Sequence, residues 1–475
     1  MLQPPRARRR RGLLWGVLSL AATGCIPYRP APLDPAGFGT AFTARRLADS
    51  GLARFLGAHG VAPTDTAWRP RDLGLVAVFF HPALDESRGA LAAARGAEVT
   101  AGMRPQSSAG VSGEYATATT AGASPWTVSL SAGIGFEGGG KRGARIARAR
   151  ALSLAAGLGL RAAAWRVALD AHQAAVAALN ADGDVADARA EDQVLSDLLQ
   201  LVRARYQEGS VSLADLAQVE AELLAAVVVR AQAERARTAA RSALAGTLAL
   251  PVDEALRVTI VEDVSEACAV VDTLDAGQLQ ALALRRRDDV GAALAEYAAA
   301  EGDVRLEVAR QYPDLRLQPA IIWDQGVLKW ALGFGLPALA FNRNQGPILE
   351  AEARRAAGAA RFEGLQQSVI RDAAAARAGC ASARREIAAV DSLVRGAKER
   401  LRIAQAAYAR GETGATQVEF ARLALVRGAR ARRAARRELD QAGVTLERAL
   451  GGWLSGPSLT AADIERSPRS SETRP

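Results

Sequence analysis

The longest proline-free stretches constrain this fold more than any other feature of the chain. Residues 126–250 and 348–456 contain no proline and are rich in Ala, Arg, Leu, Glu and Gln, which favour helices. Because proline breaks helix interiors, its absence over such lengths predicts very long helices. A single helix over 144–206 would span roughly 95 Å at ~1.5 Å per residue, far more than a helix of a globular domain. Asp182-Gly183-Asp184 is a candidate interruption of that helix.

The chain also repeats itself at a period of about 200 residues, which indicates a tandem duplication. Four landmarks recur in the same order, 202 to 208 residues apart. The four pairs are Pro105 and Pro313, Trp126 and Trp330, Phe136 and Phe341, and Tyr206 and Tyr408.

Each repeat is predicted to contain a helical stretch, two alternating segments and a long helical pair. The helical stretches are 71–102 and 276–310, and we expect the tail to be disordered. The resulting segments are a signal peptide (1–24), a lipidated N-terminal segment (25–70), the first repeat (71–250), a connector (251–275), the second repeat (276–454) and the tail (455–475).

The alternating segments have the pattern of outer-membrane strands. In Trp126–Phe136 the even positions are apolar and the odd positions are Thr, Ser or Gly. Lys329–Phe341 alternates similarly, and the partner segments are 110–117 and 314–323. A period of two with one apolar face and aromatic ends is typical of membrane strands, although a soluble hairpin can share it. The repetition of this pattern between long helices favours the membrane interpretation.

Four strands are too few to close a barrel. Closed outer-membrane barrels begin at about eight strands, and open edges in lipid cost several kcal/mol for each unpaired backbone group. Two chains would supply eight strands around an interior filled by side chains, whereas three would supply twelve and leave room for a pore. A duct therefore requires three or more chains.

The N-terminus has the features of a secretory signal. Residues 6–11 hold five arginines, and the apolar run 13–22 is too short to span a bilayer. The cysteine in Thr23-Gly24-Cys25 resembles that of a bacterial lipobox, although Ala22 stands where the motif usually has Leu. We expect cleavage before Cys25 and lipidation on it; simple cleavage with an incidental cysteine is the alternative.

Composition excludes several other classes of function. Removing residues 1–24 lowers the formal net charge from +9 to +4, which weakens any case for nucleic-acid binding. Cys268 and Cys380 are too few for a disulfide framework, and the sequence leaves open whether they are free. We find no catalytic constellation, no metal-ligand cluster and no need for a cofactor. No apolar stretch after residue 25 has the length of a membrane helix, so strands would have to span the membrane.

The order of signal, helix, strand pair and long hairpin, occurring twice over roughly residues 70–453, resembles the TolC outer-membrane efflux proteins. Trp323-Asp324-Gln325-Gly326, Lys329-Trp330 and the segment from Phe341 to Glu352 resemble the cobalt–zinc–cadmium (heavy-metal RND) branch more specifically. The first copy is looser, with Glu137-Gly138-Gly139-Gly140 where the family often has an Asp-Gly-Gly turn.

This resemblance implies a mainly α fold with a small β part. Three chains would share a twelve-stranded β-barrel in the outer-membrane lipid, and their long α-helical hairpins would form a periplasmic barrel. The hairpin tips would dock on a periplasmic adaptor, which joins the duct to an inner-membrane RND-type pump. The expected tip residues are Tyr206, Gly209, Tyr408 and Gly411, and both glycines suit a left-handed helix cap.

Acidic residues near the tips are candidates for a ring at the pore. The expected members are Asp215, Glu220 and Glu419. The family's second tip commonly carries Asp near the constriction, whereas this chain has Gln417 and Phe420 there. A gating role therefore does not transfer directly.

Two further features admit simpler explanations. Six arginines crowd one helix and suggest contact with cell wall, acidic lipid or acidic cargo, but a solvated outer face is the favoured interpretation. Gly138–Gly140 before Lys141 lacks the spacing of a phosphate-binding loop and is better explained as a strand-to-helix turn. The arginines are Arg427, Arg430, Arg432, Arg433, Arg436 and Arg437.

The leading function is a passive exit duct and not an enzyme. The alternatives are a non-channel periplasmic helical lipoprotein that bridges the envelope, and an adaptor subunit of the same pump. A high-salt wash separates these, because a barrel protein stays with the outer membrane. The sequence does not identify the cargo: the branch resemblance suggests divalent metal cations, and small toxic compounds are also compatible with a passive duct.

Overall fold

The computed structural model describes residues 27–61, 67–119, 122–261, 267–335, 343–454 and 459–465. The chain divides into two compact units, Met1–Arg45 and Arg46–Pro475. The described part of the first unit contains helix α2 (Pro35–Thr43), whose N-terminus is capped by the Asp34 side chain. The expected signal peptide and Cys25 lie outside the described residues.

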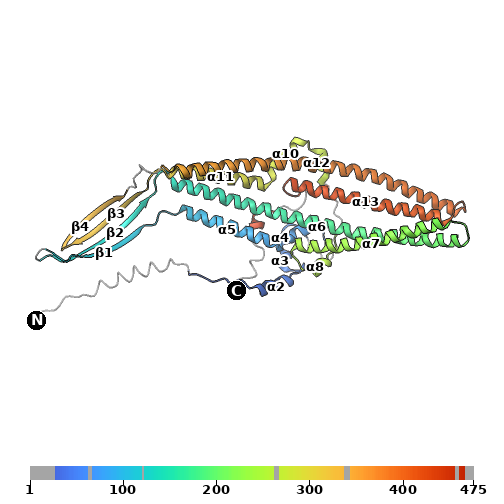
Figure 1. The fold of residues 1–475 in the computed structure, drawn as a ribbon, viewed down its shortest axis with the longest axis horizontal. Coiled ribbons are helices and arrows are strands. Elements are labelled where there is room, and N and C mark those ends of the chain that lie inside the picture. Colours follow the sequence, from blue (N-terminus) through green and yellow to red (C-terminus); the bar gives the residue numbers. More distant parts are fainter. Residues whose placement is uncertain are drawn as a thin grey trace. The chain divides into compact units, whose positions relative to one another are not determined.

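The second unit contains two successive sets of elements, one in each segment expected to be a repeat, and each set has the order of helices, strand pair and long hairpin (Figure 1). The first repeat consists of α4 (Pro70–Phe80), α5 (Pro82–Gly102), β1 (Ser108–Tyr115), β2 (Trp126–Phe136), α6 (Lys141–Gln207) and α7 (Leu213–Leu248). The second consists of α10 (Ala276–Arg286), α11 (Asp288–Ala309), β3 (Leu315–Asp324), β4 (Val327–Gly335), α12 (Gln345–Ala409) and α13 (Ala415–Ala449). The remaining elements are α3 (Ser50–Ala58), α8 (Val252–Leu256), η1 (Ala267–Ala269), α9 (Val270–Thr273) and α14 (Ala461–Glu465).

Helix α6 is continuous over 67 residues, so the interruption considered at Asp182-Gly183-Asp184 does not occur. Arginines from both neighbouring helices bind the two carboxylates: Arg237 donates to Asp182 at 2.8 Å, and Arg437 donates to Asp184 at 2.7 Å. A Cβ on Gly183 would lie 2.8 Å from Cδ of Arg433, so glycine makes room for that side chain. Neighbouring helices thus explain a triplet that looks like a helix breaker in isolation.

The two shorter predicted helical stretches are each broken once. His81 is extended (ψ 123°) because the following Pro82 disfavours helical geometry before it, and α5 starts at that proline. Arg287 is extended in the second repeat (ψ 115°), and its guanidinium binds Asp289 at the start of α11. Each of the helical stretches expected at 71–102 and 276–310 therefore consists of two helices that are separated by one extended residue.

The four strands form one antiparallel sheet in the order β1-β2-β3-β4. The predicted β2 is confirmed at both ends, and the ends of the other strands differ from the prediction by one or two residues, apart from the end of β4. The predicted end of β4 at Phe341 lies outside the described residues. The turns of both hairpins lie at the end of the second unit opposite the sheet (Figure 1).

The largest apolar core lies beside the middle of α6. It joins α3, α4 and α6 to the end of α7 and to the segment around Val258 and Ile260. Leu459 (8% exposed) and Ile464 (0%) pack into this core, and the Ile464 carbonyl accepts a hydrogen bond from Arg88 Nε at 2.8 Å. The expectation of a disordered tail is therefore wrong for residues 459–465, because two apolar side chains dock there.

A disulfide joins Cys268 of η1 to Cys380 of α12, with Cα atoms 5.3 Å apart. Both cysteines lie in a second apolar core that ties the connector to α10 and α12. The sequence left the state of these cysteines open, because they are separated by 112 residues and no spacing rule pairs them. Disulfides form in oxidising compartments such as the periplasm, so this bond agrees with an exported protein.

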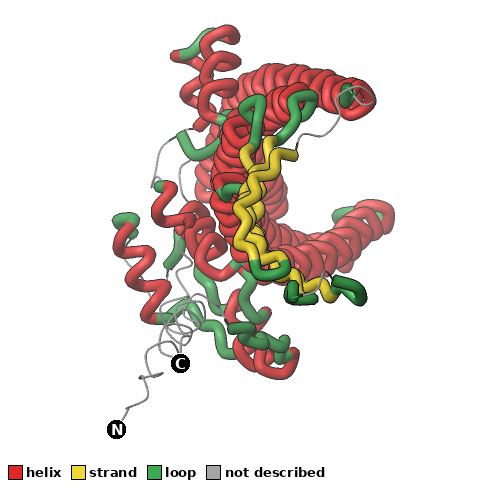
Figure 2. Tube along the Cα trace, turned by 90° about the vertical axis from the view of Figure 1, so that its left-hand side faces the viewer, coloured by secondary structure: helices red, strands yellow, loops and turns green. Residues whose placement is uncertain are grey.

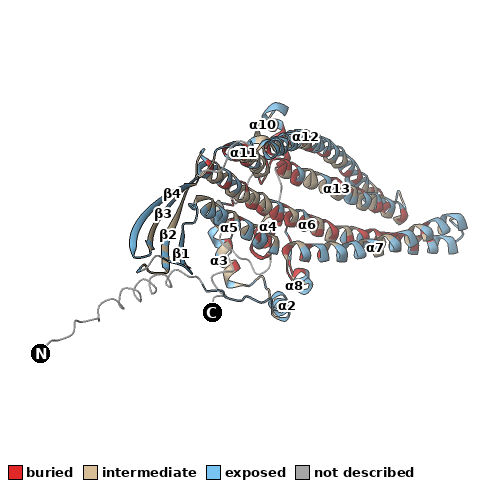
Figure 3. Ribbon diagram, turned by 60° about the vertical axis from the view of Figure 1, so that its left-hand side comes forward, coloured by how far each residue is buried: buried red, intermediate tan, exposed pale blue. Residues whose placement is uncertain are grey.

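Among the described residues, one helix is long and apolar enough to cross a membrane, contrary to the sequence expectation. An 18-residue window of α6 has a mean hydropathy of 1.2, and 33% of it is buried within the chain. Figure 3 shows α6 more buried than the strands, and α6 packs against α4, α5, α11 and α13. Packing between helices accounts for this apolar character.

Candidate functional site

One face of the sheet is apolar and the other is polar. Val111, Leu130, Ile321 and Trp330 are register partners across the four strands. The neighbouring row is Gly110, Ser131, Ala320 and Ala331. The apolar residues project into solvent in the single chain: Leu130 is 53% exposed and Phe334 is 64% exposed. Such alternation matches lipid on one face and a watery lumen on the other.

The polar face carries its own hydrogen bonds. Ser112 and Ser129, on neighbouring strands, have their Oγ atoms 2.7 Å apart. Thr127 donates to Asp324 at 2.7 Å, and Lys329 donates to the same carboxylate at 2.6 Å.

The sheet joins α6 through a tight turn. Gly139 (φ 66°) and Gly140 (φ 78°) adopt left-handed conformations that side chains disfavour. Lys141 at the start of α6 is 9% exposed and donates to Asp314 at 2.7 Å. Asp314 also accepts from the Gly138 backbone, so the glycines form the predicted strand-to-helix turn.

Both hairpin turns have the predicted glycine geometry. Gly209 (φ 71°) and Gly411 (φ 74°) follow the ends of α6 and α12. Their amides donate to the carbonyls of Tyr206 and Tyr408, each at 2.9 Å. A Cβ at either glycine would meet open space, so both turns face away from the chain.

The two turns lie beside each other. Arg205 near the end of α6 donates to Thr416 at the start of α13 at 3.1 Å. Behind this contact an apolar cluster joins α6, α7 and α13 through residues that include Leu195, Leu198, Val219 and Leu423. Figure 2 looks along the helices and shows how they are arranged side by side.

The three candidate pore acids have local partners in the single chain. Asp215 forms a capping box with Ser212, and these hydrogen bonds lower the pKa of the Asp215 carboxyl. Glu220 accepts from Arg203 at 2.7 Å, and Glu419 pairs with Arg422 at 3.0 Å. The structure therefore places these acids near the tips, but each is already bound within one chain.

The arginines of α13 are not a simple solvated face. Arg427 and Arg430 both bind Glu191 of α6, at 2.9 and 3.1 Å. Arg433 binds Asp187, and Arg437 binds Asp184, both at 2.7 Å. The acids recur every three to four residues along α6 and so form one stripe, which the arginines of the antiparallel α13 match. This ladder fixes the register between the two hairpins.

A buried charged cluster lies where α4, α6 and α13 meet. Glu447 is fully buried and accepts from Arg71 at 3.2 Å. His172 Nδ1 lies 3.7 Å from Glu447, but burial and the nearby Arg71 lower the pKa of His172 to about 3. His172 is therefore neutral, and its contact with Glu447 is not an ion pair. Sequence reasoning missed Glu447, because nothing local distinguishes it from the exposed acids of α13.

Among the described residues, no three His, Cys, Asp or Glu side chains gather closely enough to hold a metal ion. The features that the structure does show are an apolar sheet face, a polar opposite face, and two adjacent helical tips.

One protein-family model matches part of the chain. Residues 279–452, most of the second repeat, match the family described as "Outer membrane efflux protein". No curated protein matches the chain.

Several solved structures share the fold. The outer membrane protein VceC from Vibrio cholerae is 21% identical with a TM-score of 0.64, covering 81% of this chain and 97% of that one. The Campylobacter jejuni CmeC outer membrane channel is 15% identical with a TM-score of 0.62, covering 99% and 98%. CusC, whose description names transmembrane channel formation, is 17% identical with a TM-score of 0.64, covering 90% and 99%.

Proposed function

We infer that this chain is an outer-membrane efflux channel of a tripartite system, since its second repeat matches that family and its fold is that of TolC-like channels. Channels of this family function as trimers in tripartite pumps. The protein is not an enzyme; it is a channel that lies in the outer membrane and extends into the periplasm. The observation that carries this inference is the four-stranded sheet with one apolar face, at the far end of two helical hairpins.

The arrangement favours a channel over an envelope-bridging lipoprotein. Strands β1 and β4 are the edges of the sheet, and lipid does not tolerate unpaired edges, so neighbouring chains must pair with them. A soluble bridging protein would not expose Trp330 (78%) and Phe334 (64%) on one sheet face. Heat-modifiable trimers in purified outer membranes would support the channel, whereas a lipid-anchored protein with soluble hairpins would form none.

We propose that the glycine turns form the end of the duct that docks on a periplasmic adaptor, which connects it to an inner-membrane RND-type pump. The two turns lie beside each other, at the end of the helical hairpins that is opposite the sheet, and their glycines face outward. The exposed Tyr206 and Tyr408 flank them (40% and 52% exposed) and offer apolar contact area.

A Gly209→Trp/Gly411→Trp variant should lose efflux while still forming membrane-inserted trimers. The new side chains would project into open space, where an adaptor would bind, and would leave the packed cluster behind the turns intact. The matched control is Gly209→Asn/Gly411→Asn, since Asn tolerates the left-handed conformation and adds little bulk. Drug or metal susceptibility of a channel-deleted strain measures efflux. Normal efflux by the tryptophan variant would reject the docking assignment.

Asp215, Glu220 and Glu419 are proposed to make the duct mouth favourable to cations. Asp215→Asn with Glu419→Gln should reduce cation preference in planar bilayers, since rings of carboxylates attract cations. Asn at 215 keeps a side chain that can accept the helix-capping bond, so the tip fold should be preserved. The reversal potential under a salt gradient is the measurement. An unchanged value would show that the acids serve only their partners within the chain.

We further propose that Cys25 carries the lipid that anchors the mature N-terminus. A single acyl chain binds membranes only marginally, so stable anchoring requires several. Mass spectrometry of the mature N-terminal peptide should show an acylated Cys25 as the first residue. An unmodified peptide that begins elsewhere would contradict the lipobox interpretation.

We propose further that the chain belongs to the heavy-metal branch and that its cargo is divalent metal cations. It rests on the sequence around Trp323–Glu352, where the Asp324–Lys329 pair and the Gln325-Gly326 turn connect β3 to β4. CusC shares the fold with this chain, as do other channels at similar identity. The test compares the growth of a deletion strain on cobalt, zinc or cadmium with that of the same strain carrying the gene. Rescue on organic toxic compounds but not on these metals would contradict the assignment.

A further inference from the structure

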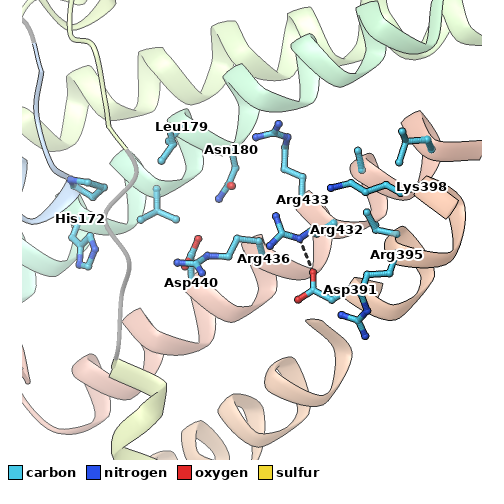
Figure 4. A pocket seen from close by; sticks show the side chains of 15 residues that line it. His172, Leu179, Asn180, Asp391, Arg395, Lys398, Arg432, Arg433, Arg436 and Asp440 are labelled. Atoms are coloured by element: carbon cyan, nitrogen blue, oxygen red, sulfur yellow. Dashed lines mark hydrogen bonds and ion pairs between the residues drawn. The ribbon is translucent and has the colours of Figure 1, made fainter. Parts of the chain in front are cut away.

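A cavity of about 660 Å³ lies between α6, α12 and α13. Its walls combine Val176 and Leu179 of α6, Val394 of α12, and several arginines of α13. Figure 4 shows Asn180, Arg432, Arg436 and Lys398 around the same space. The cavity contains none of the residues of the hairpin turns or the sheet, and it lies between helices that the proposed function assigns to the duct.

The walls of this cavity hold more positive than negative charge. Arg432 pairs with Asp391 at 2.6 Å, Arg436 with Asp440 at 3.1 Å, and Arg433 with Asp187. Two further cations, Arg395 and Lys398, line the cavity without a carboxylate partner among the described residues. Arg395 donates to Ser392 Oγ at 2.7 Å. His172 adds no charge, because its lowered pKa keeps it neutral.

An unused hydrogen-bond donor also lines the cavity. Asn180 is only 7% exposed, and no acceptor within the described part of the chain binds its Nδ2 atom. A buried polar group without a partner costs about 1–3 kcal/mol, so such groups are normally paired. An acceptor atom of a bound molecule would remove this cost. Two cations without carboxylate partners and a buried donor, all in the lining of one cavity, have the chemistry of an oxyanion site.

We propose that this cavity binds a small soluble molecule through its carboxylate or phosphate groups. Lys398 and Arg395 neutralise the anion, and Asn180 Nδ2 donates to one of its oxygens. The cavity is larger than a single phosphate ion and has room for a small organic acid. The arginine cluster of α13, beyond fixing the helix register, thereby lines a site for an anion rather than for a metal cation.

Lysine reactivity provides a direct test in the intact, detergent-solubilised protein. The chain has only three lysines: Lys141 is buried against Asp314, Lys329 lies in the sheet, and Lys398 lines the cavity. Citrate or inorganic phosphate at millimolar concentration should slow acetylation of Lys398 at least several-fold and saturably, relative to chloride at equal ionic strength. Acetylation of Lys329, followed in the same mass spectra, should not change.

Variants assign the effect to the cavity. Asn180→Leu and Arg395→Gln should each abolish the protection of Lys398, whereas Arg400→Gln, which removes an exposed cation from the same helix outside the cavity, should retain it. Because Asn180 lacks a partner, leucine at this position should not harm folding. Equal slowing at Lys329, protection that does not saturate, or protection that survives Asn180→Leu would each overturn the proposal. Protection by vesicles of anionic lipid but not by citrate would assign the site to a headgroup and reject a soluble ligand.

Discussion

Leu130→Arg and Phe334→Arg should each prevent the protein from assembling in the outer membrane. Both residues belong to the apolar face of the sheet, 53% and 64% exposed in the single chain. Leu130 lies between Val111 and Ile321 in the register, and Phe334 pairs with Leu317, so each substitution puts a charge among lipid-facing side chains. A charge at mid-bilayer costs about 2–4 kcal/mol on the lipid-facing side of a barrel. This cost arises once in each of the three chains of a trimer. Heat-modifiable trimers in purified outer membranes measure assembly.

Ser131→Arg is the matched control for this prediction. Ser131 is the next residue along β2 and points to the opposite face, beside Gly110 and Ala320. An arginine there should enter the water-filled lumen and leave trimers largely intact. If all three variants failed equally, or if Ser131→Arg were the most damaging, the assignment of lipid and lumen faces would be wrong.

Glu447→Ala should destabilise the helical part by about 3–5 kcal/mol, the usual cost of removing one partner from a buried ion pair. The Glu447 side chain is fully buried, accepts from Arg71 of α4 at 3.2 Å and accepts from the Leu454 amide at 3.4 Å. Its loss leaves the Arg71 guanidinium, 12% exposed, without this carboxylate. Urea-induced unfolding, followed by the far-ultraviolet circular dichroism of the helices, measures the change.

Two variants separate this effect from simple truncation. Glu438→Ala removes an exposed acid from the same helix and should change stability by less than about 0.5 kcal/mol. The double variant Arg71→Met/Glu447→Leu replaces the pair by apolar side chains and should recover most of the loss, as buried pairs often allow. If the double variant were no more stable than Glu447→Ala, packing of the Glu447 side chain rather than its charge would be the cause.

The local sequence was sufficient to predict the helices and strands and their order along the chain. Proline-free, alanine-rich stretches predicted the four long helices because helix propensity acts over neighbouring residues. Alternation in Trp126–Phe136 predicted β2 to its ends, since period two fixes which side chains share a face. Glycines 209 and 411 were predicted as left-handed caps because helix ends have a local signature, and the structure confirms both.

Contacts between distant residues were decided only by the tertiary structure. The Cys268–Cys380 disulfide, the buried Glu447 and the docking of Ile464 each join segments remote in sequence, and no local pattern encodes such pairings. The same reason explains the two failures on α6 and α13. Asp182-Gly183-Asp184 disfavours a helix by itself, and arginines on one face suggest solvent, until the antiparallel packing of α13 on α6 brings the charges together. Sequence thus determined the order of the elements and the alternation along the strands, whereas long-range packing determined the charge pairs and the cavity between them.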